Sequence, residues 1–339
     1  MEPGGHRPPV SARPVTPLLC ILGPTASGKS SLAMALARSQ RLGTVEIVSI
    51  DSALVYTGMD IGTAKPSAQE RAEVPHHLID CCAPEDAHSV ADHLEAARQA
   101  VADIHQRGHT PLLVGGTMLY FKAMRDGIDA LPRCSNETRE RIAQAARRQG
   151  WPALHAQLAE RDPDTAARLS PQDAQRIARA LEVLEETGQS LTEWIAQSQA
   201  EGRGLTPLGP LKTVALLPED RSWLHARIAQ RLEAMVANGF IEEVRALKRR
   251  PGLTAEHPSM RAVGYRQAWA HLSRSPGFES LEAFTQKALE ATRQLAKRQL
   301  TWLRSFEDVT RVDPQTQSMD QLITVCAELA GRGPTSPTR

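Results

Sequence analysis

Short apolar runs alternate with amphipathic stretches through the first 130 residues of the chain. Three runs are suited to buried parallel strands, at residues 18–22, 45–50 and 111–114. Helical patterns follow the first run at residues 30–38 and precede the third at residues 89–107. Because strands alternate with helices, the pattern predicts a parallel sheet with helices on its faces.

The pattern changes between about residues 131 and 200, where strand signals stop and only helical periodicity remains. Ile177 and Leu181 belong to a helical stripe that we expect to be buried. Ser170, with Asp173 three residues later, resembles a capping box at the start of that helix. The whole stretch is interpreted as an inserted all-helical domain, with helices predicted at residues 136–149, 151–161 and 173–187.

Strand and helix patterns resume after a linker that contains Gly and Pro. A strand is predicted at residues 212–217, and helices are predicted at 222–238, 240–250, 260–272 and 281–306. The N-terminus offers too little apolar surface to fold, so we expect it to be disordered. The predicted parts are a disordered N-terminus (1–16), a first core segment (17–130), the helical insertion (131–200), the returning core with C-terminal helices (205–312) and a weakly ordered tail (313–339).

Composition describes an ordinary globular chain of 339 residues, 41% hydrophobic and 23% charged. The net charge is only +1, yet residues 201–305 carry 17 Lys and Arg against 10 Asp and Glu. Such an excess suits a surface that faces a polyanion, although a solvated charged face is the commoner cause of a modest excess of charge. The five cysteines show no C-x-x-C spacing, which argues against a disulfide framework or a zinc site and favours a cytoplasmic protein. Residues 1–17 are rich in Pro and Gly and lack an apolar segment, so we do not expect them to be a signal peptide, and no apolar run approaches membrane-spanning length.

One motif connects the first predicted strand to the helix after it. It fits the phosphate-binding loop pattern G-x-x-x-x-G-K-[ST] and comprises Gly23, Pro24, Thr25, Ala26, Ser27, Gly28, Lys29 and Ser30. Glycines let successive backbone N–H groups point inward at a polyphosphate, at the positive end of the helix. Lys29 adds a point charge, and the Ser30 hydroxyl can bind Mg²⁺. The alternative is a chance match in a strand-to-helix turn, but the flanking pattern favours a P-loop NTPase-like sheet.

Asp51 follows the second predicted strand directly, at the sheet edge where open α/β folds bind ligands. In an ATPase, a later strand would end in an acidic residue that helps to hold magnesium, but here the comparable strand ends in Gly115-Gly116-Thr117. Asp51 is therefore the best-placed carboxylate for a general base in a transferase. The alternative is a structural role, in which Asp51 caps a helix or orients Lys29.

Further motifs share one resemblance, which extends over about residues 18–306. They are the loop at 23–30 and the stretches at 51–56, 58–66, 76–80, 114–120, 173–183, 263–266 and 297–302. Together with the loop, these stretches resemble the bacterial tRNA dimethylallyltransferases, also called isopentenyl-diphosphate:tRNA transferases. The set is far more specific than the loop alone.

The resemblance implies transfer of a dimethylallyl group from dimethylallyl diphosphate to N6 of adenine 37, in tRNAs that read codons beginning with U. It implies that the loop cradles the donor's diphosphate, with Lys29, Ser30-bound Mg²⁺ and Arg231 stabilising the leaving group. Asp51 would take the proton of the adenine amine, and Thr25 would help to position donor or base. The adenine must leave its stack to reach such a pocket.

The resemblance also implies contacts with the anticodon stem-loop of tRNA, with the helical insertion as a clamp. The residues concerned are Asp51, Ser52, Ala53, Leu54, Thr117, Arg139, Gln175, Arg176, Ile177, Ala178, Arg179, Arg261, Ala262, Val263, Gly264, Tyr265 and Arg266. Without the resemblance, Arg176 and Arg179 would be assigned to a solvated helix face. For Trp302 a core position is expected, and for His76 and His77 a structural or hydrogen-bonding role.

Two departures from the family pattern stand out. Ala53-Leu54 replaces the Met-Gln of many relatives, and the chain has no Cys/His spacing for the C-terminal zinc finger that some relatives carry. Three other functions stay open: an adenylate dimethylallyltransferase, a kinase that holds ATP in the loop, and an RNA-binding module with a vestigial loop. The helical insertion argues against the first, and intact Lys29 and Asp51 argue against the last. A monomer is expected.

Overall fold

The computed structural model describes residues 17–331 and contains one parallel six-stranded sheet. The strand order is β3-β2-β4-β1-β5-β6, and each neighbouring pair is parallel. Strand β1 is central, because its Ile21 pairs with Val114 of β4 on one side and with Val214 of β5 on the other. The phosphate-binding loop follows this strand. The strands are β1 (Leu18–Leu22), β2 (Val45–Ile50), β3 (His76–His77), β4 (Thr110–Gly115), β5 (Leu211–Leu216) and β6 (Thr310–Val312).

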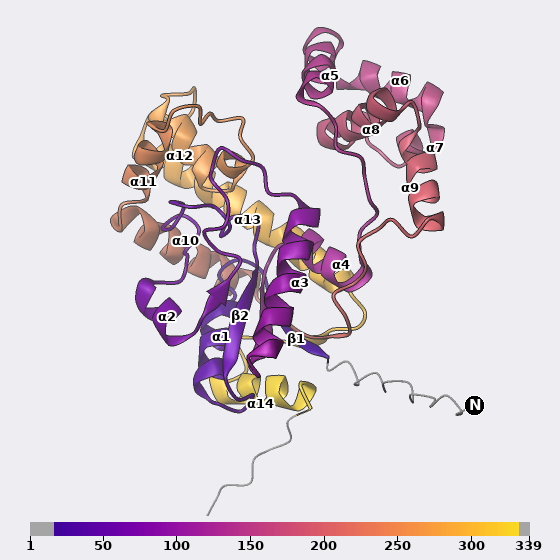
Figure 1. Cartoon of the computed structure of the whole chain (residues 1–339). Coiled ribbons are helices and arrows are strands. Elements are labelled where there is room, and N and C mark those ends of the chain that lie inside the picture. The colour runs from indigo at the N-terminus through magenta and orange to yellow at the C-terminus, as the bar shows by residue number, and fades with distance from the viewer. Residues whose placement is uncertain (1–16, 332–339) are drawn as a thin grey trace, which may run out of the picture. The chain divides into compact units, whose positions relative to one another are not determined.

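Helices cover the sheet and extend beyond it at its carboxyl edge (Figure 1). One core cluster joins α1, α14 and the sheet, and a second joins α11, α12 and α13 around the buried Phe240 and Phe284. The helices of this part are α1 (Lys29–Arg38), α2 (Ala68–Glu73), α3 (Val90–Gln106), α4 (Met118–Asp126), α10 (Arg221–Ala237), α11 (Phe240–Lys248), α12 (Tyr265–Leu272), α13 (Leu281–Ser305) and α14 (Met319–Leu329).

The chain divides into two compact units. The sheet unit contains the residues up to Arg125 and from Leu208 onward, and the helical unit is Asp126–Pro207. An antiparallel bridge between Ile128 and Leu205 joins the two ends of the helical unit, which encloses the predicted insertion at 131–200. Its helices are α5 (Asn136–Gln149), α6 (Trp151–Arg161), α7 (Pro163–Ala167), α8 (Ala174–Thr187) and α9 (Leu191–Ala200). Ile177 and Leu181 lie in its core, as the helical stripe predicts.

One predicted capping box and one predicted helix start are wrong. Helix α8 is capped by Asp173 itself, whose carboxylate accepts the Arg176 N–H at 3.3 Å, so the predicted capping box at Ser170 does not form. Helix α12 begins at Tyr265 rather than at residue 260, because Gly264 adopts φ 93° and separates the helix from a short 3₁₀ turn, Ser259–Arg261. A left-handed residue cannot continue a right-handed helix.

The predicted weakly ordered tail is also wrong for most of its length. Helix α14 has a full capping box at Ser318, and Leu322, Ile323 and Cys326 pack into the core beside α1 and the sheet. Helix α14 is amphipathic, and its apolar face is buried only when the sheet unit is folded. The predicted disorder at 1–16 and in the last eight residues lies outside the described part of the chain. Between residues 17 and 331, no helix is long and apolar enough to cross a bilayer.

Candidate active site

The phosphate-binding loop occupies the turn between β1 and α1. Gly28 adopts φ 98° at the start of α1, and Ala26 adopts φ 63°, so the loop uses left-handed backbone conformations that aim N–H groups inward. The turn after β4 packs closely against it, because a Cβ at Gly116 would lie 3.0 Å from the Gly23 carbonyl oxygen. A side chain at this position would therefore push against the Gly23 carbonyl and the Gln299 side chain.

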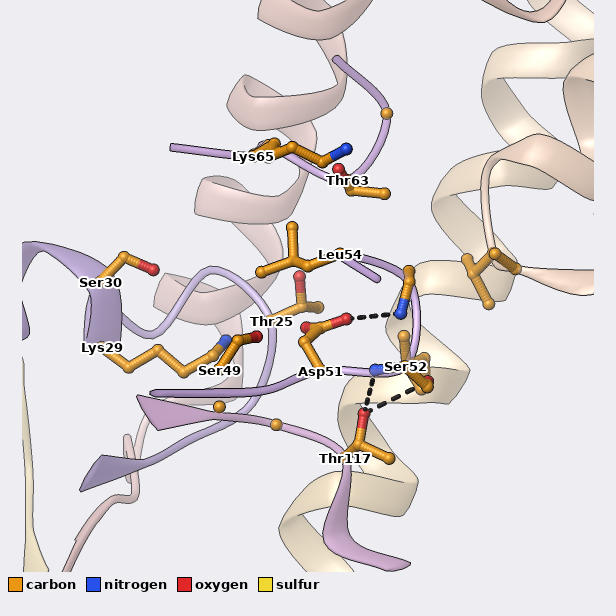
Figure 2. Close-up of a pocket in the computed structure, with 18 of the residues that line it drawn as sticks. Thr25, Lys29, Ser30, Ser49, Asp51, Ser52, Leu54, Thr63, Lys65 and Thr117 are labelled. Carbon is orange, nitrogen blue, oxygen red and sulfur yellow. Dashed lines mark hydrogen bonds between the residues drawn. The ribbon is translucent and has the colours of Figure 1, made fainter. Parts of the chain in front are cut away.

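Asp51 and Thr117 follow the neighbouring strands β2 and β4 at their carboxyl ends. The Asp51 carboxylate accepts the Ala53 N–H at 2.9 Å, which fixes the turn after β2 (Figure 2). The Thr117 hydroxyl accepts the Ser52 N–H at 3.0 Å and donates to the Ser52 hydroxyl at 3.3 Å. The residues directly after Asp51 form a turn and not a helix, so the helix-capping role of the alternative interpretation is not seen. The carboxylate holds this turn and also lines the cavity beside Thr25 and Lys29.

Two cations face Asp51 in a partly buried setting. Burial lowers the pKa of Lys29 to about 8, and the opposite charge of Asp51 limits the decrease while the like charge of Arg231 adds to it. Burial also lowers the pKa of Arg231, again opposed by Asp51. Two close cations with one carboxylate leave a net positive field, which favours a bound anion.

These groups line a cavity of about 610 Å³ within the sheet unit. One part of its wall is polar and contains Thr25, Lys29, Asp51 and Arg231. The lining also includes apolar side chains, among them Leu54, Ile79, Ile228, Leu232 and Met235, and further polar ones such as Lys65, His76 and Arg298. A ligand with a charged end and a short hydrocarbon end matches this mixed lining, because both kinds of surface are present in one cavity.

A magnesium ion would depend on few protein ligands here. The described residues hold no cluster of three or more His, Cys, Asp or Glu side chains suited to a metal. Ser30 is exposed at the start of α1 and lines the cavity, so its hydroxyl could bind Mg²⁺ together with diphosphate oxygens and water. Ser49, which shares a face of β2 with Asp51, has a buried hydroxyl with no partner among the described residues. This polar surplus fits a hydrated ion and its diphosphate.

Two side chains that hold the loop have no assigned role in the sequence analysis. Gln299 on α13 accepts the Thr25 N–H at 2.9 Å and donates to the Gly116 carbonyl at 2.8 Å. Arg227 on α10 donates to the Ala26 carbonyl at 2.8 Å. Gln299 belongs to the stretch at 297–302 that carries the family resemblance, so that motif was the available signal.

Comparisons with known proteins agree with this architecture. The model of the IPP transferase family matches residues 54–306 of the chain. The tRNA dimethylallyltransferase of Cupriavidus necator is 52% identical over 299 residues, covering 88% of this chain and 91% of the relative. That of Methylibium petroleiphilum is 56% identical over 290 residues, covering 85% and 86%. The chain belongs to the IPP transferase family.

Solved structures related to the IPP transferase family have the same fold. The full-length tRNA isopentenylpyrophosphate transferase of Bacillus halodurans has a TM-score of 0.64 at 34% identity, covering 94% of this chain and 96% of that chain. A eukaryotic dimethylallyltransferase acting on tRNA has a TM-score of 0.74 at 22% identity, covering 94% and 80%, a likeness that shows the fold alone. The predicted family and the predicted P-loop NTPase-like fold are confirmed.

Within this member of the IPP transferase family, the predicted RNA-contacting residues of the sheet unit differ in exposure. Arg261 is exposed at the cavity, and Arg266 is exposed on α12, outside the cavity lining. Tyr265 is fully buried, and its hydroxyl donates to Glu243 at 2.6 Å, so its side chain has a structural partner instead of an open face. The core position expected for Trp302 is wrong, because its side chain is 36% exposed and lines the cavity. Ser52 is exposed, and the remaining residues are half-buried or buried: Ala53, Leu54, Thr117, Ala262, Val263 and Gly264.

The helical unit carries the other predicted RNA contacts, and only some of them are available at its surface. Arg139, Gln175 and Arg176 are exposed, although Arg176 also pairs with Asp173 at 2.8 Å. Ile177 is fully buried in the core, so its side chain cannot contact RNA without opening that core. Arg179 is half-buried and donates to the Pro132 carbonyl at 2.8 Å and to Cys134 Sγ, and Ala178 is half-buried.

Proposed function

We propose that the protein transfers a dimethylallyl group from dimethylallyl diphosphate to N6 of adenine 37 in tRNAs that read codons beginning with U. The cavity of about 610 Å³ in the sheet unit carries this proposal, because Thr25, Lys29 and Ser30 of the phosphate-binding loop, Asp51 and apolar side chains all line it. The names of the relatives support it as well, since they are tRNA dimethylallyltransferases. The tRNA substrate and the reduced state of the five cysteines favour the cytoplasm as its location.

In the proposed reaction, N6 of adenine attacks the first carbon of the dimethylallyl group. A C–N bond forms, the C–O bond to the diphosphate breaks, and the bonding electrons leave with the diphosphate. The exocyclic amine is a weak nucleophile because its lone pair is shared with the ring, so Asp51 takes its proton as general base. Lys29 and Arg231 stabilise the negative charge that grows on the leaving oxygen. Mg²⁺ at Ser30, when bound, would neutralise further charge on the diphosphate.

The acceptor would enter as an extruded base. The proposed general base Asp51 lines the cavity together with Ser52, Leu54 and Thr117. Arg261 is exposed at the same cavity and could contact a phosphate or a nucleobase of the tRNA. Extrusion costs a few kcal/mol, and least for a base in a single-stranded loop. Arg139, Gln175 and Arg176 on the helical unit would contact the anticodon stem, where phosphate contacts set affinity rather than sequence choice.

The test is transfer of radiolabelled dimethylallyl diphosphate to an unmodified anticodon stem-loop that contains three adenines at 36–38. AMP serves as the rival acceptor and ATP as the rival donor in parallel reactions. We expect label on adenine 37 with the wild-type protein. Label on AMP alone would identify a free-nucleotide transferase, and turnover of ATP alone would identify a kinase; either result would overturn the proposal.

A further inference from the structure

One carboxylate outside the cavity's polar wall collects four hydrogen bonds. Glu243 on α11 accepts the backbone N–H groups of Asp60 at 2.9 Å and Ile61 at 2.7 Å on Oε2. Its Oε1 accepts the Gly62 N–H at 3.2 Å and the Tyr265 hydroxyl at 2.6 Å. Three successive backbone amides therefore converge on one anion, which fixes the conformation of that segment as a unit.

This segment is pressed against the helices that hold it. A Cβ at Gly62 would overlap the Phe240 ring and come within 2.7 Å of the Tyr265 ring. Phe240 and Tyr265 are both fully buried and pack edge to face with 5.1 Å between ring centroids. The segment thus lies against a rigid aromatic wall, and Glu243 holds it there.

The residue after this segment contacts the active site. The Thr63 carbonyl accepts a hydrogen bond from Arg231 Nη2 at 3.0 Å, and both residues line the cavity (Figure 2 shows Thr63). Among the described residues, the Arg231 guanidinium donates its hydrogen bond to this carbonyl. A guanidinium has five N–H donors in a fixed plane, so one anchored N–H orients the others.

We propose that Glu243 is a positioning residue for Arg231. By holding the amides of residues 60–62, it places the Thr63 carbonyl, which orients the guanidinium toward the diphosphate of the donor. The inference rests on the proposed function for the identity of the donor. In this proposal buried Tyr265 also has a role, because its hydroxyl donates to Glu243 and so orients the carboxylate.

The alternative is that Glu243 only stabilises the fold. Its neighbour Glu242 offers a matched control on the same helix, because it is exposed and its side chain accepts a local hydrogen bond from Arg245 at 3.2 Å. Glu243→Met removes the acceptors at similar side-chain volume, whereas Glu243→Gln keeps one acceptor oxygen for Asp60 and Ile61. If Glu243 positions Arg231, the Glu243→Gln variant should retain much of the kcat that the Glu243→Met variant loses.

The experiment is a double-mutant cycle on the full chain. We measure kcat, KM for dimethylallyl diphosphate and urea unfolding for Glu243→Met, Glu243→Gln, Glu242→Met, Arg231→Ala and the Met/Ala double variant. We expect Glu243→Met to lower kcat about 10- to 100-fold, because small displacements of a catalytic group cost this much. In the Arg231→Ala background the same change should cost less than about threefold, since interacting residues are not additive. Glu242→Met should leave kcat unchanged.

A fully additive cycle, or a Glu243→Met variant whose folded fraction retains wild-type kcat, would overturn the positioning role. If Glu243→Met does not fold, the cycle is run with Glu243→Gln and Tyr265→Phe in its place. Direct binding of inorganic pyrophosphate is measured for the same variants. Wild-type protein that binds pyrophosphate without transferring prenyl groups would contradict the proposed function, while the binding cycle would still decide the link between Glu243 and Arg231.

Discussion

A carboxylate lies near each end of strand β2, Glu46 near its start and Asp51 directly after it. The two carboxylates differ in how completely their charges are paired. At the amino end, Glu46 is 3% exposed and accepts two hydrogen bonds from Arg107, at 2.9 and 2.8 Å. It also bonds His77 and His109, each at 2.6 Å. The bonds from Arg107 and the two histidines hold the pKa of Glu46 at about 2. The structural role expected for the histidine pair at 76–77 is thus visible for His77.

At the carboxyl end, Asp51 faces the cations Lys29 and Arg231. Its negative charge does not fully offset the cost of burying their two positive charges. The pKa values of Lys29 and Arg231 are both lowered by burial. The hydroxyls of Ser27 and Ser49 are buried without partners among residues 17–331. A protein gains stability by pairing such groups, so leaving them unpaired indicates a place for a ligand. The amino end therefore serves the fold, and the carboxyl end serves the reaction.

The largest expected effect comes from Asp51→Asn. This change removes the proposed base and keeps the side-chain volume and an acceptor for the Ala53 N–H. We expect kcat to fall about 10²- to 10⁴-fold, the range for loss of a general base, with little change in the urea midpoint. Single-turnover transfer to the stem-loop measures it. A variant with wild-type kcat would show that Asp51 only holds the turn after β2.

Glu46→Gln should do the reverse, with a large effect on stability and almost none on kcat. Breaking this buried cluster should lower the free energy of unfolding by about 3 kcal/mol at pH 7, because Arg107 and the two histidines lose their shared anion. The pKa of Glu46 is lowered, so its contribution is complete above its ordinary pKa near 4.5 and disappears as the pH falls toward about 2. Urea unfolding between pH 7 and pH 3 should show the two proteins converging in acid. A constant difference across that range would contradict this assignment.

Lys29 should make donor binding depend on pH. Its pKa of about 8 means that the free protein loses this charge as the pH rises through 8. We expect affinity for dimethylallyl diphosphate to be flat between pH 6.5 and 7.5, then to fall by up to about tenfold per pH unit above 8. Calorimetric titrations measure the affinity, and Lys29→Arg, which keeps its charge, should abolish the fall. Equal affinities at pH 7 and pH 9.5 in the wild type would be incompatible with this role.

The smallest expected effect is that of Gln299→Met, which leaves the Thr25 N–H and the Gly116 carbonyl without their partner. We expect kcat to fall about fivefold through displacement of the loop. The free energy of unfolding should fall by about 1 kcal/mol for the unmade hydrogen bonds. Gln294→Met, an exposed position on the same helix, is the control and should change neither quantity. If both variants behave alike, Gln299 does not brace the loop.

Local patterns in the sequence were sufficient for the parts of the site that lie on one turn of chain. The strands at 18–22 and 45–50, the phosphate-binding loop and the position of Asp51 at a strand end follow from apolar runs and adjacent polar residues. The structure reproduces each of them. These features are encoded within about ten residues, so neighbouring side chains and backbone preferences determine them.

Tertiary structure alone decided which distant side chains support those local features. Gln299 reaches Thr25 across 274 positions, and Glu243 reaches Gly62 across 181, so no periodicity in the sequence could pair them. The same reason explains the order in α14, whose apolar face depends on the sheet unit, and the burial of Tyr265. Local sequence determined where the reactive groups stand on their own elements. Packing of segments far apart in the chain determined which of them are exposed, which are held and which face one another.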